Sequence, residues 1–251
     1  MFMRLLQLNI LSSYARNFKL IYETTVIPKL KEMPGCKFVA LIENSLRENE
    51  FISLTLWETQ DQAENYERGE VFKELTDIIQ SYLSESSEWK VQLSENLELE
   101  YKPSKEELVI QKYNVAVQSN SEITESTEAN LLYVRIVSST IQKGKEEEFR
   151  NIYSSEIIPV LLSTKGCLYA YLTQNVENKN SYISVTIWDS KKDADYYESS
   201  GKFDELVKKV MHTFSDFYRW KLALEKESKA SIKTSEDLEV AKYVMVTRKK
   251  F

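Results

Sequence analysis

Six side chains stand out in this chain because they form three pairs that share one spacing. In each pair the second residue follows the first by 131 positions. The pairs are Arg4 and Arg135, Trp57 and Trp188, and Tyr66 and Tyr197. Indole N–H groups and phenolic hydroxyls donate hydrogen bonds, and a guanidinium holds an anion through charge-assisted bonds. Together these residue types could bind and polarise a small molecule.

No other catalytic signature accompanies these pairs. The chain has no glycine-rich phosphate loop and no Gly-x-Ser-x-Gly motif, and its one histidine, His212, could serve a Ser-His-Asp triad at only one place. One histidine and two cysteines give no plausible zinc site. The sequence therefore predicts no metal and no cofactor.

The spacing of the pairs extends over a whole domain. Residues 1–90 align with residues 132–221 without a gap, and roughly a third of positions from Tyr22 to Lys90 are identical. A repeat of this length indicates two copies of one domain rather than a solenoid. We predict a first domain over 1–118, a Ser/Thr/Glu-rich linker over 119–130 and a second domain over 131–251.

Composition narrows the class of protein. Of 251 residues, 42% are apolar and 29% are charged, which is ordinary for globular domains. The net charge of −6 argues against a nucleic-acid partner, and no apolar run is long enough to span a membrane. Cys36 and Cys167 occupy equivalent positions, so we expect both to be reduced and buried in a cytoplasmic protein.

Each repeat has the pattern of a ferredoxin-like unit, with the order β-α-β-β-α-β. The first repeat is predicted to contain strands over 2–11, 36–44, 50–57 and 89–93, a helix capped by Ser12–Ser13, a short helix capped by Thr59 or Asp61, and a longer helix over 71–82. Pro28 predicts a kink in the first helix, and Gly69 predicts a break between the other two.

The expected strands leave one face of each sheet uncovered. Both faces of the strand over 50–57 carry apolar residues, so the open face needs a cover. The equivalent face of the other repeat is the simplest cover, which predicts two fused repeats forming a pseudo-dimeric α+β barrel within one chain. Two further β-rich segments, 107–117 and 237–247, are expected as extra strands beyond the four of each repeat.

Several short motifs resemble one known family. The first repeat reads Pro34-Gly35-Cys36, Ile52-Ser53-Leu54-Thr55-Leu56-Trp57-Glu58-Thr59, Ala63, Tyr66 and Phe72-Lys73-Glu74-Leu75, and the second repeat keeps Gly166-Cys167, Ile183-Ser184-Val185-Thr186-Ile187-Trp188, Ala194, Tyr197 and Phe203-Asp204-Glu205-Leu206. This pattern resembles the antibiotic biosynthesis monooxygenase domain over about residues 1–93 and 132–224. The resemblance implies a dimeric α+β barrel, here built from two fused copies.

The resemblance also implies chemistry. Some members oxygenate quinols or anthrones without metal or flavin, which would make the partner of this chain a small aromatic molecule. In that case the tryptophans would line the slot for the ring, the tyrosines would supply hydroxyls, and Arg4 and Arg135 would stabilise a phenolate. Other members degrade haem, but neither helix after the tryptophans carries the expected histidine, and Thr140 stands where the first copy has Asn9.

Two other interpretations remain open. The tryptophans and tyrosines could be packing residues, and the arginines could pair with carboxylates, in a barrel that only binds a hydrophobic ligand or serves as a scaffold. Further polar positions bear on this choice. Ser53/Ser184 and Thr55/Thr186 match between repeats, whereas Asn9/Thr140 and Glu43/Gln174 differ, so the two pockets need not be equivalent. Trp89 and Trp220 are expected at the interface between repeats, and further oligomerisation is open.

Overall fold

A computed structural model describes residues 1–83, 85–93, 99–105, 109–118, 132–215 and 238–250. The first repeat contains β1 (Phe2–Asn9), a 3₁₀ turn (Ser12–Tyr14), α1 (Ala15–Ile21), a π-helical turn (Tyr22–Val26), α2 (Ile27–Lys31), β2 (Cys36–Asn44), β3 (Glu50–Trp57), α3 (Gln60–Arg68), α4 (Glu70–Gln80), β4 (Glu85–Leu93), β5 (Leu99–Lys105) and β6 (Val109–Gln118). The second contains β7 (Tyr133–Thr140), α5 (Glu146–Ile152), a π-helical turn (Tyr153–Ile157), α6 (Ile158–Ser163), β8 (Cys167–Asn175), β9 (Ser181–Trp188), α7 (Lys191–Ser199), α8 (Lys202–Val210), a 3₁₀ turn (Met211–Thr213) and β10 (Leu238–Lys250).

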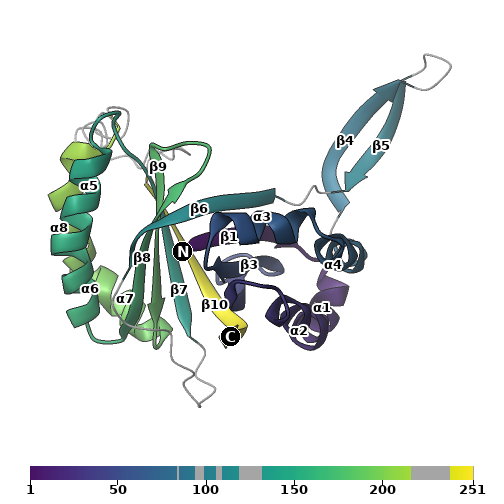
Figure 1. The fold of residues 1–251 in the computed structure, drawn as a ribbon, viewed down its shortest axis with the longest axis horizontal. Helices are drawn as coiled ribbons and strands as arrows, with labels where there is room; N and C mark the ends of the chain where they lie inside the picture. Colours follow the sequence, from purple (N-terminus) through teal and green to yellow (C-terminus); the bar gives the residue numbers. More distant parts are fainter. Residues whose placement is uncertain (84, 94–98, 106–108, 119–131, 216–237, 251) are drawn as a thin grey trace.

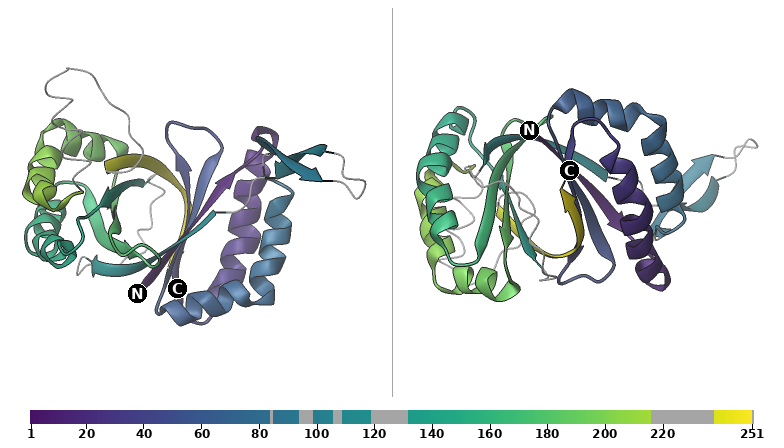
Figure 2. Two further views of the ribbon diagram at one scale, coloured as in Figure 1. Left: turned by 90° about the horizontal axis from the view of Figure 1, so that it is seen from above. Right: turned by 60° about the horizontal axis from the view of Figure 1, so that its bottom comes forward.

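The strands form one closed ring. Each repeat contributes a three-stranded antiparallel sheet, β2-β3-β1 in the first and β8-β9-β7 in the second. β6 joins β1 to β8, and β10 joins β7 to β2, so the order β1-β3-β2-β10-β7-β9-β8-β6 closes a barrel. Helices lie on the outer side of each sheet, so the two helical layers stand at opposite ends of the molecule (Figures 1 and 2). This arrangement is the predicted pseudo-dimeric α+β barrel.

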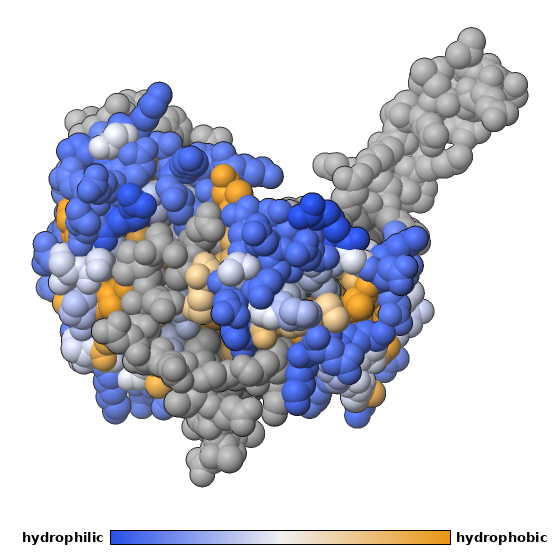
Figure 3. Space-filling model, viewed as in Figure 1, coloured by the Kyte–Doolittle hydropathy of each residue, from blue (hydrophilic) through white to orange (hydrophobic). Residues whose placement is uncertain are grey.

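The barrel interior is an apolar core shared by both repeats. Alternate residues of β1, β2 and β3 pack there against those of β7, β8 and β9, including Leu5, Leu54, Ile136 and Val185. The opposite faces of the same strands pack against the helices of their own repeat and form two further clusters. The open face of each sheet is therefore covered by the other repeat, as predicted. Burial of apolar area favours this packing, because it is the dominant favourable term in folding. On the face drawn in Figure 3 the coloured surface is mainly hydrophilic, and apolar residues occur there in small groups.

The strand predicted over 89–93 is present within β4, but its predicted place as the fourth strand of the first sheet was wrong. Residues of β4 pair with β5 in a separate two-stranded sheet that projects from the barrel, and no barrel strand pairs with it in the described chain (Figure 1). β6 takes the fourth position beside β1, and β10 takes it beside β7. The segments expected as extra strands are thus the fourth strands themselves. The edge of β1 that is not paired with β3 can pair with only one strand. We attribute the choice of β6 over β4 to the second pairing of β6, with β8, which closes the barrel.

The helix caps and breaks predicted for the first repeat are only partly present in the structure. Near Pro28, where a kink was expected, the helix changes type: residues 22–26 form a π-helical turn, and α2 then begins with proline in its first turn. The cap expected from Ser12–Ser13 is absent, because Leu11 precedes the 3₁₀ turn and no side chain caps it. Thr59 does cap α3, in a capping box with Gln62, and Gly69 separates α3 from α4.

Candidate functional site

The two tryptophans are packed inside their repeats. Both Trp57 and Trp188 are fully buried, and each indole N–H donates a 2.9 Å hydrogen bond to the threonine two residues earlier, Thr55 or Thr186. Trp57 stacks on Tyr66 with ring centroids 5.1 Å apart, and the equivalent rings in the second repeat are 5.0 Å apart. The indole donors are therefore already used within the protein.

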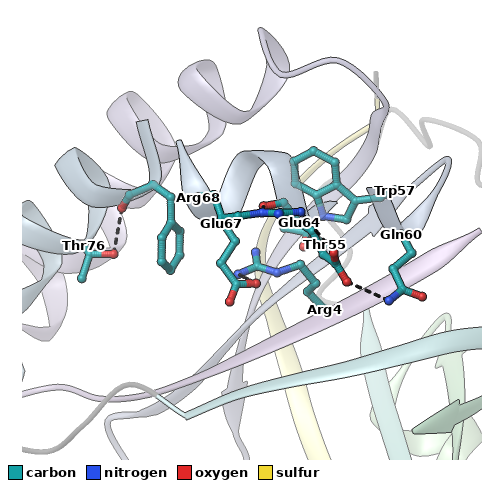
Figure 4. Close-up of polar contacts among 9 residues, drawn as sticks. Arg4, Thr55, Trp57, Gln60, Glu64, Glu67, Arg68 and Thr76 are labelled. Atoms are coloured by element: carbon teal, nitrogen blue, oxygen red, sulfur yellow. Dashed lines mark hydrogen bonds and ion pairs between the residues drawn. The ribbon is translucent and has the colours of Figure 1, made fainter. Parts of the chain in front are cut away.

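Arg4 lies beneath the helices of the first repeat. Its guanidinium carbon is 5.4 Å from the ring centre of Tyr66 and 5.3 Å from that of Phe72. One terminal nitrogen is 3.5 Å from a carboxylate oxygen of Glu67, but Nε and that nitrogen have no hydrogen-bond partner in the described chain. Figure 4 shows Arg4 between Glu67 and the strand that carries Thr55 and Trp57. Burial lowers the pKa of Arg4 from its usual value.

Arg135 occupies the equivalent place with better bonding. Its guanidinium carbon is 5.3 Å from the ring centre of Tyr197 and 4.8 Å from that of Phe203. Both Nε and Nη2 donate to one carboxylate oxygen of Glu198, at 2.9 and 2.6 Å. The sequence-based alternative that the arginines pair with carboxylates therefore describes both repeats, and the pairs are buried on the arginine side.

Sequence reasoning matched Ser53 with Ser184 but missed Tyr22 and Tyr153, the tyrosines that lie beside these serines. The hydroxyl of Tyr22 lies 2.6 Å from Oγ of Ser53, and that of Tyr153 lies 2.5 Å from Oγ of Ser184. Each tyrosine is the first residue of a π-helical turn, a feature that often occurs at functional sites. The available signal was the identity of both tyrosines and both serines at the common spacing.

A cavity of about 60 Å³ lies in the second repeat, between the sheet and the helices, and it opens toward solvent. Its polar lining comes from Arg135, Ser139, Tyr153, Ser184, Thr186 and Tyr197. Apolar side chains make up the rest of the wall, among them Val137 and Phe149. Two of the six predicted site residues, Arg135 and Tyr197, therefore border one space, while Trp188 is not among its lining residues.

The first repeat carries a different hollow. A space of about 400 Å³ lies where α3 meets α4, and Trp57, Tyr66, Gly69 and Glu70 border it. Arg4 is not among its lining residues, because it lies on the strand side of Tyr66. The predicted residues of the first repeat are thus close to one another without enclosing one common space.

Burial raises the pKa of each tyrosine near the two arginines, so these hydroxyls stay protonated at neutral pH. Protonated tyrosines donate hydrogen bonds and do not act as bases. Burial also raises the pKa of the Cys36 and Cys167 thiols to about 12, and both cysteines are free. The second repeat therefore offers donors and a paired cation to a ligand.

The remaining candidates lie elsewhere. His212 is exposed and hydrogen-bonds Glu148, at 2.8 Å. Within the described residues no cluster of His, Cys, Asp and Glu could hold a metal ion, and no helix is long and apolar enough to cross a membrane. Trp89 is a residue of β4. Trp220 and the predicted linker lie outside the described residues.

This barrel of two repeats, each with the same buried Trp-Tyr-Arg arrangement, defines an α+β barrel protein of the dimeric type. The family profile of the antibiotic biosynthesis monooxygenases matches residues 1–77 and 132–209. The chain belongs to this family, as a tandem pair of its domains.

Solved structures support the same fold. A Fusobacterium nucleatum protein assigned as a monooxygenase is 9% identical with a TM-score of 0.69, and the match covers 99% of this chain and 94% of that one. An anthrone oxidase-like protein is 14% identical with a TM-score of 0.58, over 99% and 92% of the two chains. At these identities the likeness concerns the fold alone. A search of the curated proteins found no match.

Proposed function

We propose that the second repeat is the working half of a monooxygenase that acts on aromatic, quinol-like or anthrone-like molecules and uses no metal or flavin. The observation that carries the proposal is the cavity between sheet and helices, where Arg135, Tyr153, Ser184 and Tyr197 come together in an apolar wall. An apolar slot with a few convergent polar groups is the usual form of a small-molecule site. The anthrone oxidase-like relative supports the substrate class by analogy only.

The residues suggest how such a reaction would be assisted. An anthrone loses a ring proton to water at the mouth of the cavity, and its oxygen then carries the negative charge. The hydroxyls of Tyr153 and Tyr197 donate to that oxygen, because their raised pKa keeps them protonated. The electron-rich ring carbon reduces dioxygen and bonds to it, giving a hydroperoxide. Loss of water from the hydroperoxide leaves a new carbonyl, so one oxygen atom enters the product and the other leaves as water.

The cavity is small for this task as it stands. At about 60 Å³ it is well below the roughly 300–1,000 Å³ of pockets that hold drug-sized ligands. A fused-ring substrate therefore requires α5 and α8 to move away from the sheet. These helices carry Phe149, Phe203 and Val207, which line the cavity. Movement of the helices would therefore be the step that admits substrate.

Oxygen consumption by metal-stripped protein tests the proposal, with a panel of anthrones and naphthohydroquinones. Tyr153→Phe should lower the rate at least tenfold, and Tyr22→Phe, the matched change in the first repeat, should leave it within twofold. Trp188→Phe and Trp57→Phe form a second matched pair. A rate that depends equally on both repeats, or uptake that returns only when a metal or flavin is added, would contradict the proposal.

One observation favours a second candidate, a barrel that binds a hydrophobic ligand or acts as a scaffold without catalysis. Both tryptophans are fully buried and their N–H groups are bonded to threonines, so these donors are not available to a substrate. This candidate predicts no oxygen uptake across the whole panel while the same compounds still bind or leave the protein unchanged.

A further inference from the structure

We propose that two positions on the first strand of each repeat confine ligand binding to the second repeat, and that the bound molecule is neutral and apolar with a hydroxyl group. These positions are Val137 and Ser139 in β7, against Leu6 and Leu8 in β1. The inference uses the site proposed above but not its reaction, so it can hold even if no oxygenation occurs.

The strand geometry places these residues along the floor of the cavity. Arg135, Val137 and Ser139 alternate along β7 and all three line the cavity. Val137 lies opposite Ser184 on β9, and Arg135 lies opposite Thr186. The floor therefore runs from the arginine to Ser139 over four residues, a length of about 13 Å at the usual rise of a strand.

The first repeat fills the same positions with larger side chains. Leu6 and Leu8 are 8% and 1% exposed and belong to the packed core that contains Phe18 and Tyr22. Leu6 has one methylene more than Val137, and Leu8 has an isobutyl group where Ser139 has a hydroxymethyl group. Protein cores are dense enough that such differences decide whether a space is open.

The helices do not explain the difference between repeats. Phe149, Tyr153, Leu161 and Leu172 of the cavity wall have identical counterparts, Phe18, Tyr22, Leu30 and Leu41. Val210 is one methylene smaller than its counterpart Ile79, but Phe214 and Ile157 are larger than Leu83 and Val26, so the balance of these changes would make the second cavity smaller rather than larger. The strand residues at positions 137 and 139 therefore account for the open space.

The charges in the cavity indicate the class of ligand. Arg135 is the one charged residue in the cavity lining, and two of its nitrogens already donate to Glu198. An anionic ligand would compete with Glu198 for the guanidinium of Arg135, which already contacts the rings of Tyr197 and Phe203. The hydroxyls of Ser139, Tyr153 and Ser184 remain in the lining, and they suit an uncharged hydroxyl group on an apolar body.

Calorimetric titration of the full chain with 1-naphthol tests this inference, with 1-naphthoate as the anion of the same ring system. Wild type should bind one equivalent of 1-naphthol, and 1-naphthoate should bind at least tenfold more weakly. Val137→Leu/Ser139→Leu should weaken 1-naphthol at least tenfold. Ser139→Ala, which removes the hydroxyl without filling the space, should weaken it only severalfold.

A transplanted pocket gives the sharper comparison. Adding Leu6→Val/Leu8→Ser to the closed variant should restore one equivalent of 1-naphthol, now in the first repeat. Circular dichroism and urea midpoints identify variants that fail to fold, and the single changes Val137→Leu and Leu6→Val then carry the test.

Three results would overturn the inference: two equivalents bound by wild type, unchanged affinity in the closed variant, or equal affinity for naphthol and naphthoate. Loss of oxygen uptake with this binding pattern intact would defeat the proposed reaction alone. Uptake that persists in the closed variant would defeat this inference and leave the reaction standing.

Discussion

The arginines of the two repeats have the same three kinds of neighbour, a tyrosine, a phenylalanine and a glutamate, but they contact the glutamate differently. Arg135 reaches Glu198 at 2.6 Å, whereas the equivalent approach of Arg4 to Glu67 is 3.5 Å. The aromatic neighbours are at similar distances in both repeats. Identity of the residues at a site therefore does not ensure identity of the site.

The helix junction offers a physical reason for the difference. In the first repeat α3 ends at Arg68, directly after Glu67, and Gly69 is extended with φ −82° and ψ 162°. In the second repeat α7 ends at the equivalent residue, Ser199, but Ser200 keeps a helical conformation with φ −73° and ψ −7°, and Gly201 then turns the chain in the left-handed region with φ 80°. Glu67 and Glu198 therefore precede two junctions of different backbone conformation. Glu198 hydrogen-bonds its arginine, whereas the approach of Glu67 to Arg4 is 3.5 Å.

The largest effect expected is one that the repeats share. Trp57→Ala and Trp188→Ala should each lower the free energy of unfolding by about 3–5 kcal/mol, because each removes a fully buried ring and leaves a cavity. Urea unfolding of both variants measures this. A much smaller loss for one of them would show that its ring is less tightly packed than its partner.

The arginines should break the symmetry. Arg135→Met removes a cation with two good hydrogen bonds and should cost about 3 kcal/mol. Arg4→Met removes a buried cation with poorer bonding and should cost about 1 kcal/mol or less. Urea midpoints compare the two variants, and equal losses would mean that the difference in bonding has no energetic consequence.

Removal of the buried tyrosine hydroxyls should lower stability equally in the two repeats, and by a smaller amount. Tyr22→Phe and Tyr153→Phe each remove one hydrogen bond to a serine, and each should cost about 1 kcal/mol of stability. Their effects on ligand should differ, since only Tyr153 borders the second-repeat cavity. A double-mutant cycle with Ser53→Ala or Ser184→Ala would show whether the two pairs are equally strong.

An effect of similar size, which depends on pH, is expected from the two thiols. Burial raises the pKa of Cys36 and of Cys167 from 9 to about 12, so the folded protein keeps these protons longer than the unfolded chain. Stability from each thiol is complete below pH 9 and declines as the pH rises toward 12. At pH 10 the loss is about 1 kcal/mol per thiol. Urea midpoints at pH 8 and 10 for wild type, Cys36→Ala and Cys167→Ala measure it, and equal losses in all three proteins would contradict it.

Much of the repeat could be predicted because its signals are local. The bounds of β2 and β3 follow from runs of apolar residues and the turns that flank them, and Thr59 was one of the two residues expected to cap α3. The strand at 89–93 was assigned to the wrong sheet because β4 and β6 compete for one edge of β1. That competition is settled by closure of the barrel, to which only β6 contributes a second pairing with β8.

The sequence by itself determined the duplication, the α+β class, the family and the equivalence of the paired residues, because each depends on patterns along the chain. Only the tertiary structure decided which partner each buried group has. Thr55 and Thr186 accept hydrogen bonds from the indole donors, Glu198 binds its arginine more closely than Glu67 does, and the cavity that an arginine lines is in the second repeat. These outcomes depend on packing differences as small as one methylene, which arise between segments far apart in the chain and leave no periodic signal in either one.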